Sequence, residues 1–102
     1  MKNGYKILWT DEAINNLGSI IKYLEENWTE KELKKFAQSL ERRINLIAIR
    51  PQIFPISRKK NEIRRSVLDK HNTIYYRVHV KNKLVEILTL WGSRRDPEKL
   101  KF

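Results

Sequence analysis

The chain has 102 residues, which is enough for one domain with a modest core but not for two. It contains no cysteine, so disulfide frameworks and thiolate chemistry are excluded, and its many aliphatic and aromatic residues argue against a disordered chain. The net charge of +10 is uneven: residues 1–49 carry +1 (eight Lys/Arg against seven Asp/Glu), whereas residues 50–102 carry +9 (14 against five). Such asymmetry favours an anionic partner, either a nucleic acid or an acidic protein segment.

The N-terminal part of the chain predicts a short strand followed by a helix. Tyr5 to Trp9 is apolar and aromatic, as is typical of a strand. Thr10 is a good N-cap, and apolar residues then recur at helical spacing as far as Asn27. The unbroken apolar stretch of a signal peptide or membrane span is missing, so we expect a cytoplasmic protein that does not enter the membrane.

A second helix is predicted to begin at a capping box and to end before a proline. Thr29 and Glu32 have the spacing at which each side chain can satisfy a free backbone amide of the other's residue. Arg50 precedes Pro51 and therefore resists helical backbone angles. Because little more than Trp28 separates the two helices, they should form an antiparallel hairpin.

Three strand-like segments follow, at residues 62–68, 73–80 and 84–91. The links between them are short enough for hairpins, which predicts an antiparallel meander. The last segment is apolar on both faces, as expected for a central strand. The predicted fold is α+β, of order β-α-α-β-β-β, with a small, mostly antiparallel sheet packed on a helical hairpin in a single domain, residues 1–102.

Alternation along the strands predicts one sheet face covered by the helices and one open face. In the segment 73–80, the residues expected to face the helices are Ile74, Tyr76, Val78 and Val80, and those expected on the open face are Tyr75, Arg77 and His79. If Ile63 and Val67 of the preceding strand also face the core, Arg64 and Ser66 join the open face. The open face would then be basic, with the loop 58–60 and the C-terminal tail at its rim.

Several segments of the chain, taken together, resemble a known family. The order of elements, with "ILWTDEAINNLGSIIKYL", "RRINLIAIRPQIFP", "IRRSVL", "TIYYRV" and "WGSRRDPEKL", is similar to the RelE/ParE superfamily of toxins from bacterial type II toxin–antitoxin modules, including the plasmid-stabilisation type. The resemblance covers nearly the whole chain, and it depends on the order and spacing of the segments rather than on one motif. It implies a cognate antitoxin as partner and a toxin–antitoxin hetero-oligomer.

Two different activities follow from this resemblance. ParE-like members poison DNA gyrase and need no catalytic group of their own. RelE-like members are endoribonucleases that cut messenger RNA on the ribosome, a reaction that needs a proton acceptor and cationic donors for the phosphate charge. Whether the chain is an enzyme therefore depends on which of the two branches it follows.

Residue by residue, the RelE-like pattern matches only in part. Arg64, after Ile63, matches the strand arginine of that branch, and Arg94 matches the arginine after the last strand, so these two are the catalytic candidates of a RelE-like enzyme. Lys59 and Lys60 lie where that branch has active-site lysines. The tyrosine that stacks on a base has no clear equivalent, and Phe102 is the only aromatic residue near its place. This incomplete set favours ParE-like inhibition of DNA gyrase, with ribosome-dependent cleavage as the alternative.

On either branch the same basic residues are the candidates for binding the target: Lys59, Lys60, Arg64, Arg65, Arg77, Arg94, Arg95 and the aromatic Phe102. Arg64 and Arg65 also fit an exposed edge strand, where charge discourages aggregation. His79 has no second histidine or carboxylate at ligand spacing and is more typical of a surface or packed histidine than of a base. No metal or cofactor is expected. A non-toxic nucleic-acid-binding module is a further alternative, although neither helix resembles a recognition helix.

Overall fold

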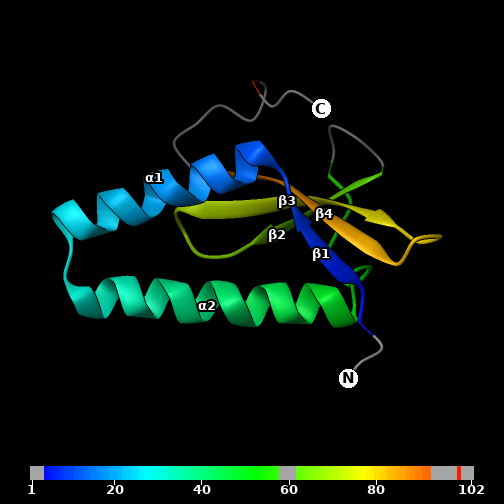
Figure 1. Cartoon of the computed structure of the whole chain (residues 1–102), viewed down its shortest axis with the longest axis horizontal. Coiled ribbons are helices and arrows are strands. Elements are labelled where there is room, and N and C mark those ends of the chain that lie inside the picture. The colour runs from blue at the N-terminus through cyan, green and yellow to red at the C-terminus, as the bar shows by residue number, and fades with distance from the viewer. Residues whose placement is uncertain (1–3, 58–61, 93–98, 100–102) are drawn as a thin grey trace.

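The computed structural model describes residues 4–57, 62–92 and Lys99, and it has the predicted order of elements. The helices run antiparallel to each other beside a four-stranded sheet, as can be followed in Figure 1. The helices are α1 (Asp11–Asn27) and α2 (Glu30–Ile49), and the strands are β1 (Lys6–Trp9), β2 (Ile63–Val67), β3 (Asn72–His79) and β4 (Leu84–Gly92). The predicted α+β class is confirmed. No helix in the described part of the chain is long and apolar enough to cross a membrane.

Both predicted helix starts are confirmed by their caps. The Thr10 side chain accepts a hydrogen bond from the Ala13 amide at 3.1 Å, and the Thr29 side chain accepts one from the Glu32 amide at 3.3 Å. Each bond satisfies one of the amides that a helix start leaves without an intrahelical partner. The end of α2 is also determined locally. Its C-cap is Arg50, and Pro51, which cannot continue a helix, comes directly after it.

The sheet has the strand order β1-β4-β3-β2, so β4 is central, as its two apolar faces predicted. β4 pairs antiparallel with β3 and parallel with β1, and β3 pairs antiparallel with β2. A β-bulge interrupts the β3–β4 pairing: Tyr75 is opposite Thr89, whereas Tyr76 is opposite Ile87. The extra residue, Leu88, changes which β4 side chains face the helices beyond this point.

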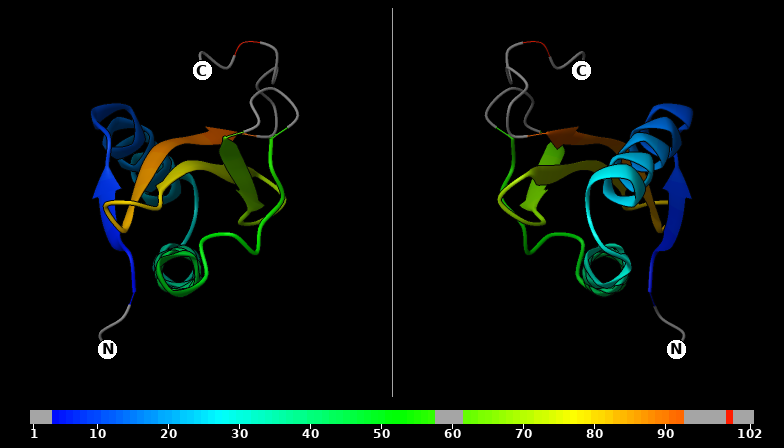
Figure 2. Two further views of the ribbon diagram at one scale, coloured as in Figure 1. Left: turned by 90° about the vertical axis from the view of Figure 1, so that its right-hand side faces the viewer. Right: turned by 90° about the vertical axis from the view of Figure 1, so that its left-hand side faces the viewer.

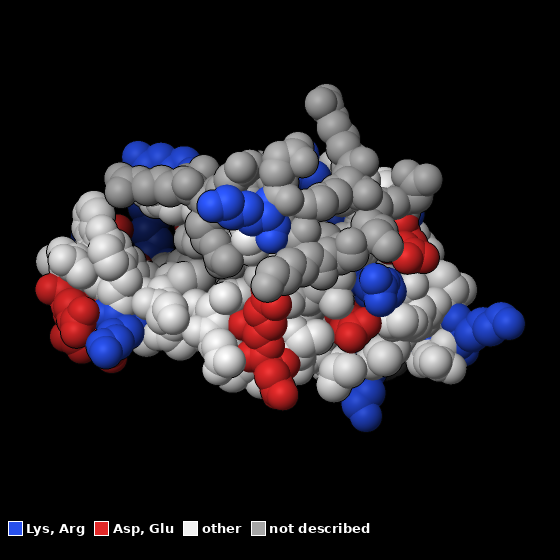
Figure 3. Space-filling view, turned by 90° about the horizontal axis from the view of Figure 1, so that it is seen from above, with Lys and Arg blue, Asp and Glu red and all other residues white. Residues whose placement is uncertain are grey.

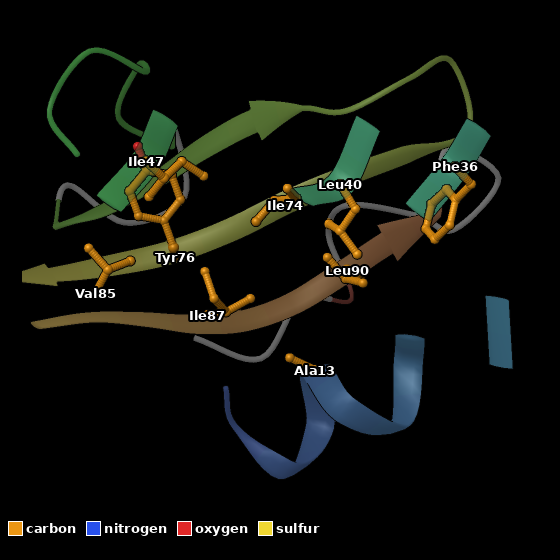
Figure 4. Packing of buried hydrophobic residues seen from close by; sticks show 9 residues of the cluster. All are labelled: Ala13, Phe36, Leu40, Ile47, Ile74, Tyr76, Val85, Ile87 and Leu90. Atoms are coloured by element: carbon orange, nitrogen blue, oxygen red, sulfur yellow. The ribbon is translucent and has the colours of Figure 1, made fainter. Parts of the chain in front are cut away.

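The main core lies between α2 and one face of the sheet. Figure 2 shows α2 end-on below the curved sheet, with α1 on the side of β1 and β4. Figure 4 shows how side chains from the facing elements meet there. The buried members of this core are Ala13, Phe36, Leu40, Ile47, Ile74, Tyr76, Val85, Ile87 and Leu90. Ile74 and Tyr76 therefore face the helices as predicted, but Val80 lies beyond the strand and is exposed.

α1 lies beside the second half of β4, where β1 no longer pairs with it. The Thr10 hydroxyl lies 2.9 and 3.0 Å from the carbonyl oxygens of Ile87 and Leu88. Further along, Asn16 Oδ1 accepts hydrogen bonds from the Leu90 amide at 3.1 Å and from the Thr89 hydroxyl at 2.6 Å. These side chains satisfy backbone groups at an edge that β1, which pairs only as far as Ile87, leaves open.

The predicted orientation of β2 is wrong. Ile63 is paired with Arg77 and Arg65 with Tyr75, so these four residues share the face away from α2. Arg64 and Ser66 are paired with Tyr76 and Ile74 and lie on the α2 side. Ile63 is fully buried, but in a second cluster with Tyr75 and Trp91 on the far face. Since both faces bury apolar groups here, the positions of Ile63 and Val67 could not determine which face of the strand meets the helices.

Candidate partner-binding and target-binding surfaces

A groove of about 300 Å³ runs between the two helices. α1 contributes Leu17 and Ile21 to its wall, β1 contributes Trp9, and the α2 residues that line it are Leu33, Phe36, Ala37, Leu40, Glu41, Ile44 and Asn45. The lining is almost entirely apolar, and on α2 it extends from Leu33 to Asn45. An apolar trough of this shape between two helices suits the apolar side of an amphipathic helix.

Arg64 holds the loop after α2 instead of facing outward. Its Nη1 donates to the carbonyl oxygens of Phe54 at 2.7 Å and Gln52 at 3.2 Å. The loop segment also extends the sheet at this point, because the Ser57 amide donates to Ile63 O at 2.6 Å and the Arg65 amide donates to Pro55 O at 2.9 Å. The guanidinium that the RelE-like pattern would use for a phosphate is thus partly occupied by the protein's own backbone.

Tyr76 and Arg43 make further hydrogen bonds that hold together α2, the loop after it and the sheet. The Tyr76 hydroxyl donates to Pro51 O at 2.6 Å, and burial raises the pKa of Tyr76 to about 12 although the nearby charge of Arg64 opposes the rise. Arg43 Nη1 donates to Ser66 Oγ and Val67 O, both at 2.6 Å, and its guanidinium lies 5.3 Å from the centre of the Phe54 ring. The sequence analysis missed Arg43, whose only signal is its place beside Phe36 and Leu40 on the sheet-facing side of a predicted helix.

Arg65 and Arg77 are the two predicted target-binding residues that the structure places on the face away from α2. The Arg77 Nη2 lies 4.0 Å from Glu62 Oε1, and its buried Nε has no hydrogen-bond partner among the residues that the structure describes. Figure 3 looks onto this side of the molecule and shows blue and red side chains interspersed. Glu86, which is paired with Arg77, lies on the same face, so the described part of the face is of mixed charge, not uniformly basic.

His79 has a carboxylate partner that sequence reasoning missed. Its Nε2 lies 3.1 Å from Glu86 Oε1, and both side chains are partly exposed. Arg77 is paired directly with Glu86 across the β3–β4 hairpin and His79 with Leu84, so His79 and Glu86 are diagonal neighbours. The available signal was the short turn, which fixes that pairing once both strands are assigned.

The structure does not describe the other predicted site residues, which are Lys59, Lys60, Arg94, Arg95 and Phe102. The whole "SRRDP" part of "WGSRRDPEKL", which contributed to the resemblance, also lies outside the described residues. Among the residues that are described, no group of His, Cys, Asp or Glu side chains is arranged to hold a metal ion.

The structure is thus a small α+β domain in which a curved sheet is packed on a helical hairpin, with an apolar groove between the helices. The chain matches the family model described as ParE toxin of type II toxin-antitoxin system, parDE, over residues 7–97. The chain belongs to this ParE toxin family.

Solved structures show the same fold at low sequence identity. One is a chain of the chromosomal ParDE toxin–antitoxin system from P. aeruginosa, with a TM-score of 0.70 and 17% identity, covering 86% of this chain and 95% of that one. Another is a chain of the toxin–antitoxin complex RelBE2 from Mycobacterium tuberculosis, with a TM-score of 0.63 and 15% identity, covering 93% of this chain and 98% of that one. No curated protein matches the chain. The predicted RelE/ParE-type fold is confirmed.

Proposed function

We propose that the protein is the toxin of a type II toxin–antitoxin module and that it acts by inhibiting DNA gyrase, without catalysis of its own. The family supports the toxin assignment. The observation that carries the choice of gyrase over RNA is the position of Arg64, whose Nη1 is bound to the carbonyls of Gln52 and Phe54. An RNA-cleaving site would need that guanidinium free to gather the charge of a reacting phosphate.

The antitoxin would bind the groove between α1 and α2. The groove has apolar walls, which suit apolar anchors, and residues 50–102 of the chain carry a net charge of +9, which suits Asp and Glu elsewhere on the same partner segment. Such a segment would fold as it binds, and opposite charge would make association fast and sensitive to salt. The two solved relatives come from toxin–antitoxin systems, which supports a hetero-oligomer of this kind.

A charge placed in the groove tests this partner site. Ala37 lines the groove at its α2 wall, so Ala37→Glu should weaken binding of the antitoxin, which we expect to be a small acid-rich protein encoded by a neighbouring gene, by roughly tenfold or more. Ser19→Glu adds the same charge to an exposed α1 position outside the groove and should leave binding unchanged. Calorimetry measures binding of both variants. If they bind equally well, the antitoxin binds another surface.

The target is tested with one purified protein in two assays. In the first, gyrase acts on relaxed plasmid; in the second, ribosomes translate a defined message. Loss of supercoiling with an intact message is the expected result. Cuts in the ribosomal A site would contradict the proposal and establish the RelE-like alternative, in which Arg64→Ala or Arg94→Ala should lower cleavage by orders of magnitude. No effect in either assay, and no growth inhibition on expression, would favour the nucleic-acid-binding module.

A further inference from the structure

One residue that lines the groove between the helices carries a charge, and that charge is negative. Glu41 follows Ala37 by one turn of α2 and Asn45 follows Glu41 by one more, so the three form a row along the groove. Apart from this row, the residues that line the groove are apolar. A carboxylate at this place calls for an explanation, because a partner rich in Asp and Glu would be repelled by it.

Glu41 has no charge partner of its own in the described part of the chain. The other two acidic residues of α2, Glu30 and Glu32, each have a lysine three or four positions later, the spacing at which helix side chains pair. No Lys or Arg lies three or four positions from Glu41 on either side. Its carboxylate also makes no ion pair or hydrogen bond with another residue that the structure describes. The charge is therefore available to a partner in the groove.

A segment that fills the groove removes water from this carboxylate. Burying an unpaired carboxylate is strongly unfavourable, whereas a carboxylate that accepts hydrogen bonds from a cation is tolerated at an interface. Asn45, one turn further along α2, offers an amide oxygen that can accept from the same cation. The planar fork of an arginine suits two such acceptors better than the compact charge of a lysine.

We infer that Glu41 is a specificity-determining residue of the groove, and that the antitoxin segment bound there places a cation, Arg or Lys, against it. The inference rests on the proposed function and adds the chemistry that the partner must have at this position. The apolar walls and the net charge of the toxin admit many acid-rich amphipathic segments. Glu41 rejects those that would bring an apolar or acidic side chain against it, and it fixes the register of the segment that fits.

The opposite interpretation is that Glu41 stays hydrated at the rim of the occupied groove. The two interpretations predict opposite effects of removing the charge. A hydrated Glu41 repels an acid-rich antitoxin, so its removal strengthens binding. A Glu41 that is paired with a cation holds the antitoxin, so its removal weakens binding and leaves the cation without its partner.

The experiment measures binding of the small acid-rich protein encoded by the neighbouring gene, by calorimetry, to matched variants of the toxin. Glu41→Gln should weaken binding roughly fivefold and Glu41→Lys roughly tenfold or more. The controls, Glu26→Gln and Glu26→Lys, make the same changes in net charge at an exposed α1 position that does not line the groove. Both controls should bind as tightly as the wild type or more tightly. Thermal melting should show all four variants folded, because Glu, Gln and Lys have similar helix propensities.

A second set of variants locates the cation on the partner. Each Lys and Arg of the acid-rich protein is replaced in turn by Gln, and each replacement is measured against the wild-type toxin and against Glu41→Gln. For one of these positions the two losses should not add, because both substitutions break the same pair.

The outcomes separate this inference from the proposed function. Unchanged or tighter binding by Glu41→Gln overturns the inference and leaves the groove as the antitoxin site, which Ala37→Glu tests independently. Losses that add for every Lys and Arg of the partner overturn it as well. If the wild-type toxin does not bind the acid-rich protein at all, the proposed partner and this inference fail together.

Discussion

Two arginines on neighbouring strands, Arg64 and Arg77, are in opposite situations. Arg64 faces α2, and its Nη1 donates to two loop carbonyls at 2.7 and 3.2 Å. Arg77 faces away from α2, is a third exposed, and lies 4.0 Å from Glu62, itself two-thirds exposed. The difference shows that a basic residue in this chain is not by itself a candidate for the target. The α2 face of the sheet uses cations to hold the fold, whereas the far face leaves its cations at the surface.

Core substitutions should give the largest contrast between the two faces. Ile47 and Ile63 are both fully buried, but Ile47 lies in the main core and Ile63 in the smaller cluster with Tyr75 and Trp91. We expect Ile47→Ala to lower the free energy of unfolding by about 4 kcal/mol and Ile63→Ala by about 2 kcal/mol, because a small cluster relaxes more easily around a cavity. Urea unfolding of both variants checks this, and a larger loss for Ile63→Ala would reverse the ranking of the faces.

Alkaline pH should lower the free energy of unfolding through Tyr76, which lies on the α2 face of the sheet. Its pKa is raised from 10.0 to about 12 by burial, so the protonated hydroxyl contributes its full stability below pH 10. That contribution is lost as the pH rises from 10 to about 12, and it amounts to about 3 kcal/mol for a shift of this size.

The control for this prediction is Tyr76→Phe, which lacks the titrating hydroxyl. Lysines that deprotonate over the same range affect both proteins alike, so the difference between their unfolding free energies should shrink as the pH rises. A constant difference across this range would show that Tyr76 does not control the alkaline stability.

The smallest effects on the unfolding free energy are expected from substituting the two arginines, Arg64 and Arg77. Arg64→Ala removes hydrogen bonds from a charged donor to two carbonyls and should cost about 2 kcal/mol of unfolding free energy. Arg77→Ala removes a long, partly exposed ion pair and should change the unfolding free energy by less than about 0.5 kcal/mol. The comparison fails if chemical denaturation finds equal losses for the two variants.

Much of the fold was predictable because its signals are local. Thr10 and Thr29 mark helix starts through bonds to amides three residues away, and Pro51 marks a helix end by its own geometry. The central position of β4 followed from its two apolar faces, because a strand buried on both sides has no polar alternation. The family resemblance drew on the order and spacing of these same elements, and the match to the ParE toxin family model over residues 7–97 confirmed it.

The surfaces were harder to predict because they depend on which residues share a face. Arg64 was assigned to the open face because Ile63 and Val67 were expected to face the core, and the assignment was wrong because the far face of the sheet also buries Ile63. His79 was taken as isolated because Glu86 comes seven positions later, although the hairpin brings them to 3.1 Å. The roles predicted for Lys59, Lys60, Arg94, Arg95 and Phe102 stay predictions.

The sequence by itself determined the helices with their caps and ends, the strand segments and the uneven charge, since each is a property of residues close together in the chain. Only the tertiary structure decided the phase of β2, the groove between the helices, and the docking of α1 on β4 through Asn16, whose hydrogen bonds reach residues more than 70 positions away. The reason is geometric. A one-residue shift in strand pairing turns every side chain to the other face, and no local pattern can exclude that shift when both faces are partly buried.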